Sequence, residues 1–133
     1  MSLEVREELR LTENAERAIL RYIAENGESR AVISAIVSPD DFENPLHQRI
    51  LGTLLEFSGR DVGNLVIPAF YALDKLGDRA AFEYFVTLGM SEPISGLAEA
   101  LKLASYIFLL SAYRREAEDD YAPKREVSGE SPW

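Results

Sequence analysis

The sequence contains no cysteine and only one histidine, His47, among its 133 residues. Without cysteine the chain can form neither disulfide bonds nor thiolate-ligated metal sites. A single histidine offers little material for a histidine-based metal cluster or a Ser-His-Asp triad. The glycine-rich phosphate motifs of nucleotide-binding proteins and the G-x-S-x-G motif of hydrolases are also missing. These absences argue against an enzyme, and we expect neither a cofactor nor a metal ion.

Positive charge is scarce in this chain. Lysine and arginine together number 14 against 23 aspartate and glutamate residues, which gives a net charge of −9 and an isoelectric point near 4.6. An acidic surface repels the phosphate groups of nucleic acid, and binding to DNA or RNA normally requires a basic patch. We therefore expect no direct contact with nucleic acid.

Long hydrophobic runs are missing as well. The longest apolar stretch, Leu103 to Tyr113, is interrupted by Ser105 and Ser111, and it is shorter than the roughly 18–20 residues that span a bilayer. The first eight residues contain no apolar signal-peptide segment. We expect a cytoplasmic protein without membrane contact, and the lack of cysteine is compatible with a reducing compartment.

Helical patterns account for most of the chain, whose 47% hydrophobic content is typical of a globular protein. Apolar residues recur at steps of three and four, and caps or glycines punctuate the segments. We expect Gly27 to end the first helix in a left-handed conformation. No segment has a convincing strand pattern, so the fold class is all-α. The expected helices span residues 13–25, 29–36, 38–41, 45–57, 66–77, 78–89 and 97–120.

The same reading divides the chain into one folded unit and two ends. Residues 13–120 form the helical domain, because they contain the periodic segments. Residues 1–12 are expected to be a flexible N-terminal lead. From residue 121 the composition changes to Pro, Lys, Glu, Ser and Gly, and we expect residues 121–133 to form a mobile polar tail.

One cluster of polar residues invites two interpretations. Asp40, Asp41 and His47 could together offer two oxygen atoms and a nitrogen atom to a cation. Alternatively, the carboxylates cap a short helix that begins at Ser38-Pro39, and His47 packs one turn before Leu51. We favour capping, because carboxylates at a helix N-terminus are common.

The last long helix is apolar on every side between Lys102 and Arg114. A surface helix of a small domain buries only one stripe of its circumference, so the remaining apolar residues must face a second chain or another part of the same domain. We favour self-association over a central helix enclosed by its own domain. The candidate self-association or partner-binding residues are Leu101, Tyr106, Phe108, Leu109, Leu110 and Tyr113.

The order of several short motifs resembles the N-terminal domain of DnaB-type replicative DNA helicases. Ala15-Glu16 precedes Ile19-Leu20, and Asp41-Phe42 precedes a His-x-x-Ile motif at residues 47–50. A segment similar to Gly-x-x-Asp ends at Asp61. A Tyr-x-x-x-Leu motif at residues 84–88 and a basic pair at residues 114–115 complete the order. Two departures are Ala80-Ala81, where the family has a glycine pair, and the apolar residues 108–110, where it has charges. The residues that match the family motifs are Glu16, Asp41, Phe42, His47, Ile50, Asp61, Tyr84 and Leu88.

This resemblance implies a small orthogonal helical bundle with a C-terminal helical hairpin, formed by Phe82–Leu88 and Leu97–Tyr113. In the family, such hairpins pair into a collar that docks primase or a helicase loader. The RecA-like ATPase domain of complete helicases is absent from this sequence, so motor activity is not implied. The chain would be a non-catalytic interaction and oligomerisation module of DNA replication, excised or encoded alone. Alternatively, it is a free-standing regulator that mimics the collar, or a relative of the primase helicase-binding domain, which shares this architecture.

Overall fold

The computed structural model describes the backbone of residues 3–57 and 63–130, and the side chains of residues 11–57 and 63–118. Within these ranges the chain is helical and contains no strand, so the all-α fold class is confirmed. The α-helices are α1 (Leu3–Glu25), α2 (Arg30–Ser34), α3 (Pro45–Glu56), α4 (Val66–Leu76), α5 (Arg79–Thr87) and α6 (Leu97–Glu130). Three short 3-10 helices are η1 (Gly27–Ser29), η2 (Pro39–Asp41) and η3 (Leu88–Met90).

The helix starts follow the capping residues in the sequence. Asn44 accepts a hydrogen bond from the backbone N–H of Leu46 at 2.8 Å, with proline at the first position of α3. Asp78 accepts one from the N–H of Ala81 at 3.2 Å at the start of α5. These side chains satisfy backbone donors that the first helical turn leaves without partners.

The two terminal helices are longer than the sequence analysis predicts. Helix α1 begins at Leu3, where a flexible lead was expected, and α6 continues to Glu130, past the expected boundary at residue 120. The first segment is rich in Leu, Glu and Arg, which are good helix formers. Residues 97–122 contain no glycine or proline, and α6 continues through Pro123 and Gly129 to Glu130. The change in composition at residue 121 therefore does not mark the end of the helix.

Gly27 has a different role from the one predicted. Among the described residues the one positive φ belongs to Gly77, which ends α4 with φ 74°. Gly27 is required by close packing, since a Cβ atom there would lie 2.8 Å from the carbonyl oxygen of Gly63 and 2.8 Å from the Cγ atom of Leu65. Its N–H donates to that same carbonyl at 2.6 Å.

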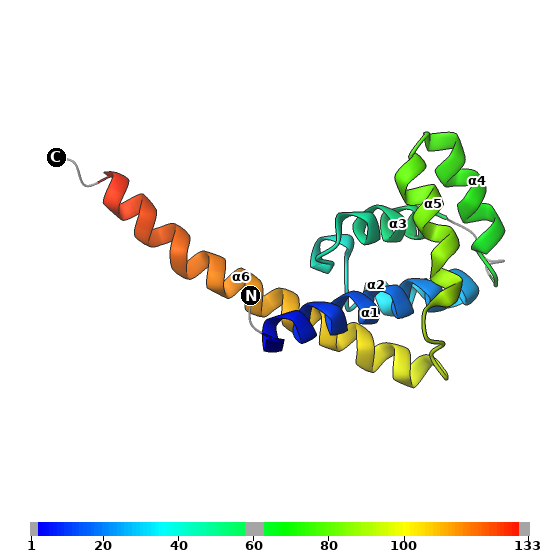
Figure 1. Cartoon of the computed structure of the whole chain (residues 1–133), viewed down its shortest axis with the longest axis horizontal. Coiled ribbons are helices and arrows are strands. Elements are labelled where there is room, and N and C mark those ends of the chain that lie inside the picture. The colour runs from blue at the N-terminus through cyan, green and yellow to red at the C-terminus, as the bar shows by residue number, and fades with distance from the viewer. Residues whose placement is uncertain (1–2, 58–62, 131–133) are drawn as a thin grey trace.

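Helix α1 lies at the centre of the body, between α3 on one side and α6 on the other (Figure 1). Helix α6 runs in roughly the opposite direction to α1, and its C-terminal half projects away from the body (Figure 1). The hydrophobic core draws on all six helices, with fully buried side chains that include Ile19, Leu20, Ile23, Ile33, Phe42, Ile50, Leu51, Leu54, Leu73 and Ile107.

The described residues do not form the hairpin that the resemblance implies. Helix α5 packs against α3 and α4, whereas α6 packs against α1, η2 and α2. Residues Phe82–Leu88 and Leu97–Tyr113 therefore belong to different parts of the bundle, because the connector that follows η3 turns the chain back along α1 (Figure 1). Within the described part of the chain, no helix combines the length and the apolar character needed to cross a membrane.

Candidate functional site

Helix α6 buries one stripe of side chains against the body. Ala100, Ala104, Ile107 and Ser111 recur at steps of three and four residues and are at most 2% exposed. The alanines permit close approach of α1, which packs along this stripe. The inner face of α6 is therefore fully used by the bundle.

The outer sides of α6 carry large apolar side chains that the bundle leaves accessible. Leu109 and Tyr113 are 64% and 74% exposed, and Phe108 and Tyr106 are 40% and 39% exposed. Leu101 and Leu110 are half-buried. The alternative of a central helix enclosed by its own domain is thus excluded for Leu109 and Tyr113, while self-association through these residues stays a prediction.

Asp41 anchors α6 to the body. Its carboxylate accepts a hydrogen bond from the hydroxyl of Ser111 at 2.8 Å and pairs with the guanidinium of Arg115, while the backbone N–H of Ser38 donates to it at 2.8 Å. Arg114 donates to the backbone carbonyl of Asp41 at 3.0 Å. One residue thus caps η2, as predicted, and also holds the middle of α6.

The environment of Asp41 favours its ionised form. Burial by itself raises the pKa of this carboxyl group. The hydrogen bonds from Ser38 and Ser111 and the charge of Arg115 outweigh burial, so the pKa lies below its ordinary value. An ionised Asp41 is consequently part of the folded state at neutral pH.

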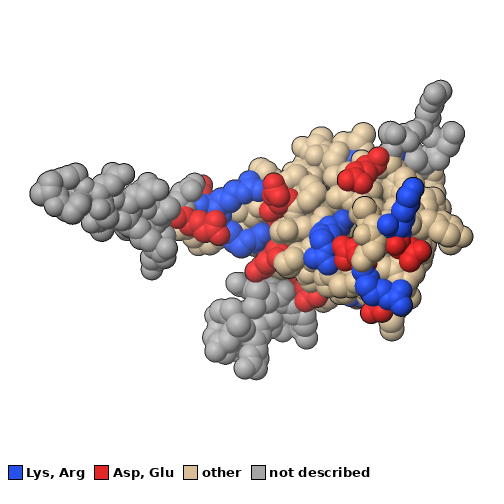
Figure 2. Space-filling view, turned by 90° about the horizontal axis from the view of Figure 1, so that it is seen from above, with Lys and Arg blue, Asp and Glu red and all other residues tan. Residues whose placement is uncertain are grey.

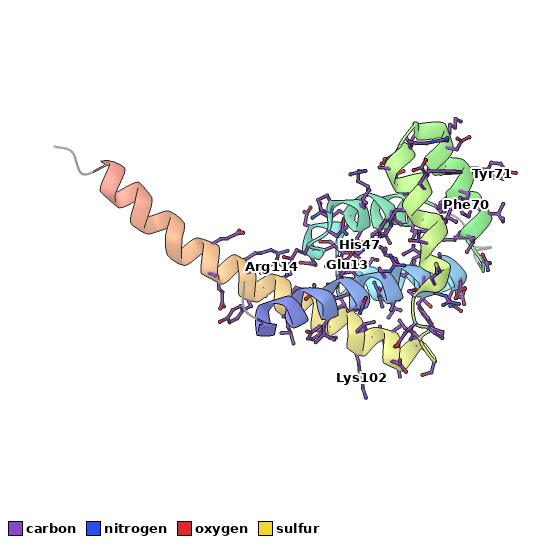
Figure 3. The ribbon with its side chains drawn as sticks, viewed as in Figure 1. Glu13, His47, Phe70, Tyr71, Lys102 and Arg114 are labelled. Carbon is purple, nitrogen blue, oxygen red and sulfur yellow. The ribbon has the colours of Figure 1, made fainter. Side chains whose placement is uncertain are left out.

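A second polar cluster connects α1, α3 and α5 inside the bundle. The Nδ1 atom of His47 lies 2.7 Å from Oε1 of Glu16, and its Nε2 atom lies 2.7 Å from the hydroxyl of Tyr84. Glu16 also accepts a hydrogen bond from the backbone N–H of Glu43 at 2.8 Å. Figure 3 shows His47 between α3 and α1. Both ring nitrogens and the carboxylate have partners, as burial requires.

Arg17 extends this cluster to the end of α5. Its guanidinium donates to the hydroxyl of Tyr84 at 2.9 Å and to the backbone carbonyl of Thr87 at 2.9 Å. It also lies 5.2 Å from the centre of the Tyr84 ring. Burial raises the pKa of Tyr84, and the hydrogen bond from Arg17 opposes that rise only in part. Tyr84 therefore stays protonated at neutral pH and joins three helices.

The structure separates the residues that could have formed a cation site. His47 is turned toward Glu16 and Tyr84, whereas Asp41 is turned toward Ser111 and Arg115. Asp40 is exposed on η2. Among the described residues, no group of three His, Asp or Glu side chains is arranged to hold a metal ion.

Most residues that match the helicase motifs lie in or around the core. Phe42, Ile50 and Leu88 are buried apolar residues, whereas Glu16, Asp41, His47 and Tyr84 form the two polar clusters. Asp61 lies outside the described residues. In this structure the described motif residues support the fold rather than an exposed site.

Two important residues were not predicted. Ser111 is noted in the sequence only as an interruption of an apolar run, and Arg17 is not singled out at all. A single hydroxyl on an otherwise apolar stripe is a usable signal, because a buried hydroxyl needs a partner. The partner itself, Asp41, is 70 residues away, and sequence spacing does not reveal it.

An open cavity of about 780 Å³ lies between α1 and the start of α6. The cavity is lined by apolar or small residues and by the polar residues Asn14, Arg17, Ser91, Glu92 and Glu99. From α1 come Leu11, Ala15 and Ala18, from η3 and the connector come Met90, Pro93 and Ile94, and from α6 come Leu103 and Tyr106. The cavity therefore borders the accessible apolar side of α6 at Tyr106.

Comparison of the sequence with protein-family models, with curated proteins and with solved structures finds no match.

Proposed function

We propose that this chain is a non-catalytic protein-interaction module that self-associates through the accessible apolar side chains of α6. The observation that supports the proposal is the exposure of Leu109 and Tyr113 on a helix whose opposite face is buried. Burial of one large apolar side chain contributes about 1.5–3 kcal/mol. Two-fold pairing uses each residue twice, so a few such residues can offset the entropic cost of association.

The anchoring of α6 also supports an interaction role. Asp41 holds Ser111 and Arg115, which lie on the segment that bears Leu109 and Tyr113. An interaction surface on a rigid element loses less conformational entropy when a partner binds. The bundle therefore serves as a scaffold that presents this segment.

We further propose a setting in DNA replication, with primase or a helicase loader as partner. This part rests on the order of the motifs around Glu16, Asp41, His47 and Tyr84. A free-standing regulator that competes for the same partners is the alternative within this setting. Isothermal titration with purified primase helicase-binding domain and with a purified loader tests it. Binding to either supports the setting, and no binding at about 100 μM contradicts it while the interaction module stands.

The self-association is tested by the variant Leu109→Glu, measured by size-exclusion chromatography with light scattering. A charge at this exposed position should give a folded, helical monomer. The matched control is Tyr71→Glu on α4, since Tyr71 is 73% exposed and points away from the body (Figure 3). This control should keep the mass of the unmodified chain. Equal masses for Leu109→Glu and the unmodified chain would contradict the proposal.

A further inference from the structure

One side of α6 carries side chains at equal spacings before and after Tyr106, and the two nearest are both leucine. Leu103 and Leu109 lie three residues before and after it, Lys102 and Leu110 lie four residues away, and Glu99 and Tyr113 lie seven residues away. Steps of three, four and seven place side chains on one face of a helix. These residues therefore form one stripe, the Tyr106 stripe, that extends roughly 21 Å at 1.5 Å per residue.

Antiparallel pairing about Tyr106 sets each of these positions opposite its counterpart in a second copy. We propose that two copies pair their α6 helices antiparallel about a two-fold axis at Tyr106, which specifies the self-association proposed above and rests on it. In this register Leu109 of one copy lies against Leu103 of the other. Tyr113 lies near Glu99, where its hydroxyl can donate to the carboxylate. The occupant of the Tyr106 stripe is thus a second copy of this chain.

The cavity beside the Tyr106 stripe gives the second helix a place to lie. Glu99, Leu103 and Tyr106 line the cavity from α6, so the half of the stripe that faces the partner's Leu109 and Tyr113 borders an open space. Its opposite walls carry Leu11 and Met90, which are 52% and 85% exposed. A helix lying on the stripe would also cover these side chains. This added contact increases the buried surface toward the roughly 800 Å² per partner that is typical of stable complexes.

The side of α6 that carries Phe108 and Leu101 does not border the described cavity between α1 and α6. Phe108 is two residues from Tyr106, about 200° away around the helix, so it points to a different side. Lys102 lies within the Tyr106 stripe, about 40° around the helix from Tyr106, and points away from the body (Figure 3). Its charged end can stay in water while its stem covers apolar surface. The geometry favours the Tyr106 side.

The absence of cysteine makes disulfide cross-linking a clean test of this arrangement. In the full chain, Tyr106→Cys places the thiol at the two-fold axis, where the two sulfur atoms approach each other. Disulfide bonds require Cα atoms about 4.4–6.8 Å apart. Mild oxidation should convert most of this variant to a covalent dimer on a non-reducing gel. Phe108→Cys and the surface control Tyr71→Cys should give little dimer under the same conditions.

A mixture of two variants tests the register. Leu103→Cys and Leu109→Cys should form several-fold more covalent dimer when mixed than either forms alone, because the axis brings these two positions together. Circular dichroism before oxidation verifies that each variant is folded. Efficient cross-linking of Phe108→Cys, or no gain on mixing, in a chain that is dimeric by sedimentation would overturn the register but leave the self-association intact. A monomeric unmodified chain would overturn both.

Discussion

The imidazole of His47 lies 2.7 Å from the carboxylate of Glu16, and the two side chains are 0% and 1% exposed. This contact connects α3 with α1 at the centre of the body. Each group would be costly to bury alone, since a buried polar atom without a partner loses its hydration and gains nothing in return. The pair therefore contributes a buried polar contact to the packing of these two helices.

Replacement of His47 by leucine should destabilise the fold strongly. The variant removes the imidazole that contacts the carboxylate of Glu16. It also removes the ring nitrogen that shares a hydrogen bond with the hydroxyl of Tyr84. We expect the free energy of unfolding to fall by about 3–5 kcal/mol, as measured by urea denaturation followed by circular dichroism. The exposed pair Arg79–Glu83 provides the control.

For that control, Arg79→Ala should change the free energy of unfolding by less than about 1 kcal/mol, since its ion pair is exposed to solvent.

A double variant, Glu16→Leu with His47→Leu, should lose less free energy of unfolding than the sum of the losses in the two single variants. Strict additivity would show that the contact does not couple the two residues.

The fold should lose stability in acid partly through Asp41. Its pKa is lower in the folded chain than in an unfolded one, so the ionised carboxylate stabilises the fold above its ordinary pKa near 4. This contribution is lost as the pH falls through the lower, folded value. Asp41→Asn should be less stable than the unmodified chain at pH 7, and the difference should shrink toward pH 3.

Thermal melts of both chains between pH 7 and pH 3 measure this dependence. The exposed neighbour Asp40 provides the control, and Asp40→Asn should change the stability at pH 7 less than Asp41→Asn does. A constant difference between Asp41→Asn and the unmodified chain across the whole range would contradict the assignment.

Two glycine substitutions should have opposite effects. Gly27→Ala places a methyl group 2.8 Å from a backbone carbonyl that cannot move freely, so the melting temperature should fall by several degrees. Gly52→Ala lies within α3, where nothing lies within 4 Å of the new atom. Alanine there should stabilise the fold by about 0.5–1 kcal/mol. Similar melting temperatures for the two variants would show that Gly27 is not closely packed.

The sequence predicts the local structure of this chain better than its long-range packing. Caps at Asn44 and Asp78 mark helix starts because capping depends on adjacent residues. The expected hairpin of Phe82–Leu88 with Leu97–Tyr113 does not form, and α6 instead packs on α1 and η2. This packing includes contacts of Ser111 and Arg115 with Asp41, about 70 residues earlier, which local sequence patterns do not reveal. The accessible residues Leu109 and Tyr113 were predicted as candidates because an all-round apolar helix exceeds what one domain can bury.

The chain should not bind DNA near physiological salt. On the face shown in Figure 2, blue basic groups lie next to red acidic ones instead of forming a continuous basic stripe. The basic pair Arg114 and Arg115 is engaged with Glu43 and Asp41. Fluorescence anisotropy with labelled single- and double-stranded oligonucleotides should show no binding. Micromolar binding that weakens steeply with added salt would contradict this expectation.

Sedimentation equilibrium of the unmodified chain tests the central claim most directly. The monomer weighs 14.9 kDa, so a dimer is readily distinguished by mass. The exposure of the apolar side chains of Leu109 and Tyr113 supports the proposed self-association. We expect a reversible association whose average mass approaches twice the monomer mass as the concentration rises to about 100 μM, well above usual dimer dissociation constants. A mass that stays at 14.9 kDa up to this concentration would contradict self-association through α6.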